Sequence, residues 1–97
     1  MEQIEHTYPA KRKVINRAHV GVVSSGDMEV LLEPADGIDA HVFIRTSVDG
    51  FGVSWKAVLD RFFSKYDGAA RIQINDAGGT PGIAQLRLEQ AVEASEQ

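Results

Sequence analysis

The stretch that decides the fold is His19–Pro34, HVGVVSSGDMEVLLEP, in which two apolar runs flank a short polar turn. Turn residues between two strand-like runs predict a β-hairpin, here with its turn at Ser24–Asp27. Gly26 can take a positive φ, and the Asp27 side chain can bond to the nearby backbone. Ser25 is therefore expected at an exposed tip. Such a hydroxyl suits covalent modification, although turn chemistry alone favours an ordinary turn.

Strands are predicted at 18–23, 28–33, 38–46 and 70–75. In each of the last three, apolar and polar residues alternate, which is the pattern of a half-buried strand. In the segment 38–46 the even positions form the expected core set, which leaves Phe43 on the outer face. This core set is Ile38, Ala40, Val42 and Ile44.

One helix is clearly predicted between the third and fourth strands. Its apolar residues follow helical spacing on one face, and Gly68 is expected just past its end as a left-handed cap. The stripe consists of Trp55, Val58, Leu59, Phe62, Phe63 and Tyr66. An aromatic stripe at this spacing is typical of a core-facing helix, so we expect it to cover one face of the sheet.

The last segment is ambiguous. Alternation across 83–89 favours a strand followed by a short helix, whereas Thr80–Pro81 resembles a helix start with proline in the first turn. The strand is the favoured interpretation. The order β-β-β-α-β-(β)-α then predicts an α+β fold, an antiparallel sheet with helices on one face.

The chain of 97 residues is expected to form one domain over 18–97, preceded by a mobile N-terminal arm over 1–17. Hydrophobic content of 43% and charged content of 25% are those of a globular protein. No apolar run suits a membrane span, and no signal peptide is visible at the N-terminus. A cytoplasmic location is compatible with the absence of cysteine.

The net charge of −4 disfavours a nucleic-acid binder. Charge is also unevenly placed, because 21–44 holds five acids and neither lysine nor arginine. This segment is expected to carry a negative field that steers basic partner surfaces, unless it is simply a solvated acidic face.

No catalytic or metal site is predicted. The scattered histidines His6, His19 and His41 lack metal-ligand spacing, and neither a serine-hydrolase elbow nor a phosphate-binding loop is present. GGTPG at 78–82 is interpreted as a turn.

The segments VGVVSSGDMEVLLEP at 20–34 and TPGIAQLRLEQ at 80–90 resemble the acyl-carrier (delta) subunit of malonate decarboxylase. Both motifs stand in that family's order and spacing, and the resemblance spans about residues 18 to 93. It implies a fold unlike the all-helical acyl carriers. The usual Asp-Ser-Leu attachment motif of those carriers is absent here.

The resemblance implies that Ser25 carries phosphoribosyl-dephospho-coenzyme A through a phosphodiester, with Gly26 and Asp27 supporting the turn. Ser24 stands where the family commonly has glycine, so it is a weaker alternative site. The implied arm thiol holds acetyl or malonyl. A transferase exchanges acetyl for malonyl, and decarboxylation regenerates acetyl on the arm.

The implied partners are an acyl-carrier transferase subunit, a malonyl transferase, the decarboxylase subunits and the prosthetic-group transferase. The chain itself would be a non-catalytic carrier. Two alternatives stay open: a carrier of the citrate lyase type, which shares the Ser-Gly-Asp turn, and an interaction domain that never carries a group. An independent small enzyme using His19 or His41 is the weakest alternative.

Overall fold

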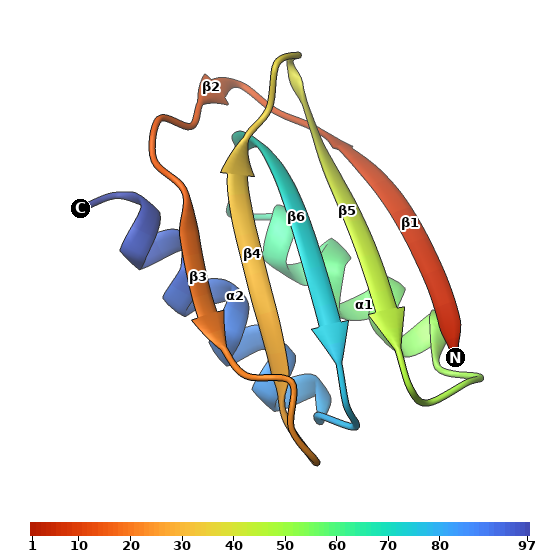
Figure 1. The fold of residues 1–97 in the computed structure, drawn as a ribbon. Coiled ribbons are helices and arrows are strands. Elements are labelled where there is room, and N and C mark those ends of the chain that lie inside the picture. The colour runs from red at the N-terminus through yellow and green to blue at the C-terminus, as the bar shows by residue number, and fades with distance from the viewer.

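The computed structural model describes residues 1–97, which form one sheet and two helices (Figure 1). Five strands precede the first helix, and the longest strand, β6, lies at the centre of the sheet. The elements are β1 (Glu2–Pro9), β2 (Arg12–Lys13), β3 (Ala18–Gly21), β4 (Met28–Pro34), β5 (Asp39–Thr46), α1 (Gly52–Phe63), β6 (Gly68–Asp76) and α2 (Pro81–Ser95).

The strand order is β1-β5-β6-β4-β3, with the short β2 paired to β6. Both helices cover the same face of this sheet, as Figure 1 shows, so the predicted α+β class is confirmed. The sheet is mixed rather than wholly antiparallel. β5 and β6 run parallel because α1 connects them as a crossover.

The core lies between the sheet and the helices. Alternate residues of β4, β5 and β6 point into it, as the period-two pattern predicts. They are Met28, Val30, Leu32, Ala40, Val42, Ile44, Ala70, Ile72 and Ile74, all essentially buried. Ile38 is the exception. Its side chain is 81% exposed, because β5 begins only at the next residue.

The expectation of a mobile arm over 1–17 is wrong. β1 pairs with β5 along the edge of the sheet, β2 pairs with β6, and Ile4 and Tyr8 pack against the core. The alternation of a strand is not visible in this segment, because the face that carries Ile4 and Tyr8 also carries the polar residues Glu2 and His6. The domain therefore includes the N-terminal segment.

α1 forms as predicted, with Trp55, Leu59 and Phe62 buried on its inner face. Gly68 does not cap it. The helix ends at Phe63, and Gly68 instead begins β6 beneath the Tyr66 ring. A Cβ at Gly68 would lie 2.3 Å from the Tyr66 hydroxyl oxygen, so close packing explains this glycine.

The strand favoured over 83–89 is also wrong, because α2 runs without interruption across that segment. The Thr80 hydroxyl accepts a hydrogen bond from the Ile83 N–H at 3.1 Å, and Pro81 occupies the first turn. Tertiary packing prefers the helix, since it buries a stripe at helical spacing: Ala84, Leu88, Ala91 and Ser95. Neither helix is both long and apolar enough to cross a membrane.

Candidate functional site

β3 and β4 form the predicted hairpin, joined by residues 22–27. Its turn is closed by a hydrogen bond of 2.9 Å from the Asp27 N–H to the Ser24 carbonyl. Gly26 has φ +78°, the positive value that a type II turn requires at its third residue. Ser25 is thus the second residue of the turn, and its side chain is exposed, as predicted.

The tip of the hairpin does not project freely into solvent. The Gly26 N–H donates to the Ala77 carbonyl at 2.8 Å, and the Ala77 N–H donates to the Asp27 carbonyl at 2.9 Å. Ala77 belongs to the loop between β6 and α2, which meets the hairpin at one end of the sheet (Figure 1). The backbone on the C-terminal side of Ser25 is therefore held in place while the serine itself faces outward.

An ion pair across 60 positions of sequence fixes the same turn. Arg87 of α2 donates from Nε to Asp27 Oδ1 at 3.1 Å and from Nη2 to Asp27 Oδ2 at 2.6 Å. The guanidinium keeps the pKa of Asp27 below its ordinary value, and the Met28 N–H, bonded to Oδ1 at 2.7 Å, acts in the same direction. Gln90 Oε1 accepts a hydrogen bond from Arg87 Nη1 at 2.9 Å, so the guanidinium is itself held in place.

β3 ends two residues earlier than predicted, at Gly21. This residue has φ +78°, and a Cβ there would lie 2.1 Å from the Met28 carbonyl oxygen and 3.0 Å from Arg87 Nε. Glycine is required at this position because φ is positive and because the Met28 carbonyl, with the Arg87 side chain beside it, leaves no room for a Cβ. Val22 and Val23 leave the strand and are more than half exposed beside the turn.

Ion pairs on the hairpin weaken the expected negative field. Glu29 Oε1 lies 2.8 Å from His19 Nε2, and Glu33 accepts from Arg17 at 2.6 Å. With Asp27 bound to Arg87, two of the five acids in this region are therefore paired with an arginine. The sequence could not reveal this, since the partners lie outside the acidic stretch.

Ser24, Ser25, Gly26 and Asp27 come together as predicted, since they share one turn. Neither Arg87 nor the Ala77 backbone was predicted to take part in the site. The only signal was the position of Arg87 inside the second family-like motif, TPGIAQLRLEQ. The histidines are distributed over β1, β3 and β5, and no group of three potential metal ligands occurs.

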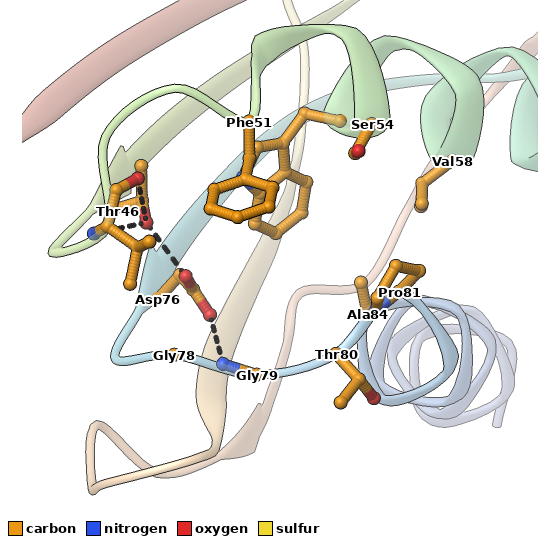
Figure 2. Close-up of a pocket in the computed structure, with 12 residues that line it drawn as sticks. Thr46, Phe51, Ser54, Val58, Asp76, Gly78, Gly79, Thr80, Pro81 and Ala84 are labelled. Atoms are coloured by element: carbon orange, nitrogen blue, oxygen red, sulfur yellow. Dashed lines mark hydrogen bonds between the residues drawn. The ribbon is translucent and has the colours of Figure 1, made fainter.

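A cleft of about 290 Å³ opens where the N-terminal ends of α1 and α2 approach each other (Figure 2). Its walls are mainly apolar, formed by Val48, Phe51, Trp55, Val58, Pro81 and Ala84. At its polar side the buried Asp76 accepts from the Thr46 hydroxyl at 2.8 Å and from the Gly79 N–H at 2.9 Å. This cleft could not be predicted from the sequence, because its walls come from three separate segments, 46–48, 51–58 and 76–84.

The arrangement offers an exposed primary hydroxyl on a constrained turn. A Cβ placed on Gly26 would have no atom within 4 Å, so there is open space beside Ser25 for a bulky group. The neighbouring carboxylate, Asp27, is bound to Arg87 and Met28 and serves the structure of the turn. These features suit attachment of a group by another protein.

Comparisons with known proteins identify the family. The model of the malonate decarboxylase delta subunit family (MdcD) matches residues 15–95. The malonate decarboxylase acyl carrier protein of Burkholderia cepacia is 48% identical over 94 residues, covering 94% of this chain and 87% of that protein. The protein of the same name from Klebsiella pneumoniae is 45% identical over 95 residues, covering 96% and 95% respectively.

The fold is also that of a solved relative. A chain in the crystal structure of a Pseudomonas malonate decarboxylase hetero-tetramer in complex with malonate superposes with a TM-score of 0.93. It is 41% identical, and the match covers 98% of this chain and 99% of that one. Sequence and fold thus agree over nearly the whole length, and the chain belongs to the malonate decarboxylase delta subunit family of acyl carrier proteins.

Proposed function

We propose that this protein carries acetyl and malonyl groups within a malonate decarboxylase complex, on phosphoribosyl-dephospho-coenzyme A joined to Ser25. The observation that carries the proposal is the exposed Ser25 hydroxyl on a turn held by Ala77 and Arg87. The family supports it, because its members are acyl carrier proteins of malonate decarboxylase.

The chain has no cysteine, so the thiol for acyl transfer must come from an attached group. When bound, that group supplies a thiol on a flexible arm, and tethering raises its local concentration at each partner active site it reaches. This chain contributes the anchor and the surface that partners recognise. Catalytic groups are assigned to the partner subunits.

Attachment is a phosphoryl-type transfer onto the serine. The bond between Ser25 Oγ and the phosphorus of an activated nucleotide donor forms as the donor's phosphoanhydride bond breaks. The hydroxyl proton passes to a base of the prosthetic-group transferase, and the phosphate-containing leaving group departs. In this scheme Asp27 orients the turn, while the missing side chain at Gly26 gives the donor room.

Intact-mass spectrometry of protein coexpressed with its modifying enzymes tests the assignment. We expect a mass gain equal to the arm in the wild type and in Ser24→Ala, and none in Ser25→Ala. A mass gain that survives Ser25→Ala, or one that Ser24→Ala abolishes, would move the anchor away from Ser25. Co-purification with decarboxylase subunits while Ser25 stays bare would instead support an interaction domain.

A further inference from the structure

The cleft between α1 and α2 begins at the same loop that holds the hairpin tip. Ala77 forms two backbone hydrogen bonds with the tip, and the next residues, Gly78 and Gly79, already line the cleft (Figure 2). A Cβ on Gly78 would lie 3.8 Å from the Gly26 nitrogen. Anchor and cleft are thus neighbours in space, although every residue that lines the cleft is at least 21 positions from Ser25 in the sequence.

We infer that this cleft is the resting site for the thiol end of the arm attached to Ser25. The inference rests on the proposed function, because it requires a group on the serine. An arm that starts at the tip can fold back across the Gly78–Thr80 segment and place its distal, pantetheine-like part between the two helices.

The chemistry of the cleft fits that part of a coenzyme A-like group. The pantetheine portion combines a dimethyl-substituted chain that bears a hydroxyl, two amides and a terminal thiol, so apolar segments alternate with a few polar groups. Binding sites for small molecules have the same composition, with apolar walls and a small number of placed polar groups. Here Phe51 and Pro81 provide apolar surface at opposite sides, as Figure 2 shows.

The polar atoms of the cleft supply acceptors and donors for the amides. Asp76 is only 7% exposed, and its two oxygens receive one protein hydrogen bond each, from Thr46 and Gly79. Each carboxylate oxygen can accept another. α1 begins at Gly52 without a side-chain cap, which leaves N–H groups of its first turn free to donate.

Size and exposure indicate which part of the arm enters. A volume of about 290 Å³ lies at the lower limit of the roughly 300–1,000 Å³ typical of ligand sites, so the nucleotide end stays outside. Phe51 is 52% exposed and Val48 is 38% exposed at the rim. Cover by the arm would remove this apolar surface from water.

Trp55 makes the inference testable, since it lines the cleft and is the only tryptophan of the chain. The experiment compares loaded wild-type protein with unloaded protein, after mass spectrometry has established loading. Because Trp55 is only 6% exposed, we expect contact with the arm to change its emission intensity in the loaded form. Amide chemical shifts should change at 48–58 and 78–84.

Two matched variants on α1 separate filling of the cleft from a general change in the helix. Val58→Phe adds bulk inside the cleft, whereas Val53→Phe adds it at a side chain that is 88% exposed and outside the lining. Both should still acquire the arm. The fluorescence response to loading should be lost in Val58→Phe and kept in Val53→Phe.

Free pantetheine, added at millimolar concentration to Ser25→Ala protein, tests the cleft without any attachment. Shifts at the same amides are the expected result, even if Ser25 proves not to be the anchor. Loading without a response from Trp55 or the cleft amides would overturn the inference and leave the proposed function standing. If Val58→Phe fails to fold, the amide shifts of the wild type decide alone.

Discussion

The orientation of α2 decides whether Arg87 can reach the hairpin, and two leucines on that helix report on it. Leu88 is fully buried in the core, whereas Leu86 is 47% exposed. Leu88→Ala should therefore lower the free energy of unfolding by about 3–4 kcal/mol, the range for removing a fully buried leucine side chain. Leu86→Ala should cost about 1 kcal/mol, because only about half of its apolar surface is buried.

Urea and thermal denaturation followed by far-UV circular dichroism give both values. For a domain of this size 1 kcal/mol corresponds to roughly 4–8 °C, so Leu88→Ala should lower Tm by at least about 12 °C. If that variant does not fold, Leu88→Val should still show a loss of about 1 kcal/mol, since it removes one buried methylene.

Equal losses for the two leucines would refute the reasoning. They would mean that 86 and 88 share an inward face, as in a strand, and residue 87 would then point away from both. The Arg87–Asp27 pair could not form in that arrangement.

Further predictions concern the turn and its supports. Arg87→Met should slow loading of Ser25 by the transferase, by about tenfold or more if the turn shifts by an ångström; mass spectrometry over time measures it, and unchanged kinetics would argue against positioning. The pKa of Asp27 is lower in the folded protein than in the unfolded chain, so its ionised form stabilises the fold. This contribution is present above the ordinary pKa near 3.9 and is lost as the pH falls through the pKa of the folded protein. The difference in stability between wild type and Asp27→Asn should therefore shrink in acid. Gly26→Ala should cost about 1 kcal/mol because φ is positive, while Gly37→Ala, equally open but without a positive φ, should be neutral or slightly stabilising in denaturant titrations. Thr80→Ala should cost about 1 kcal/mol through loss of the helix cap, and Thr80→Ser should restore most of it.

Much of the fold followed from local patterns. The alternation in β4, β5 and β6 placed their core faces correctly, and the apolar stripe from Trp55 onward identified α1. β1 was missed because its inward face mixes polar and apolar residues, so no period is visible. The segment 83–89 satisfies both periods, and only packing of Leu88 and its neighbours against the sheet selects the helix.

For the site, the turn was predictable and its surroundings were not. Ser-Gly-Asp between two apolar runs specifies an exposed serine through local turn chemistry, and the family resemblance singled out Ser25. The partners that hold the turn, Ala77 and Arg87, lie 50 or more positions away in the sequence. Nothing local relates them to it.

The sequence by itself determined an α+β chain with a serine at the tip of a hairpin, because strand alternation, helix stripe and turn chemistry act over a few neighbouring residues. Only the tertiary structure decided that this tip is clamped by α2 and opens beside an apolar cleft. The reason is the strand order, which places β4 between β6 and β3 and thereby brings the hairpin tip against the loop that leads from β6 to α2.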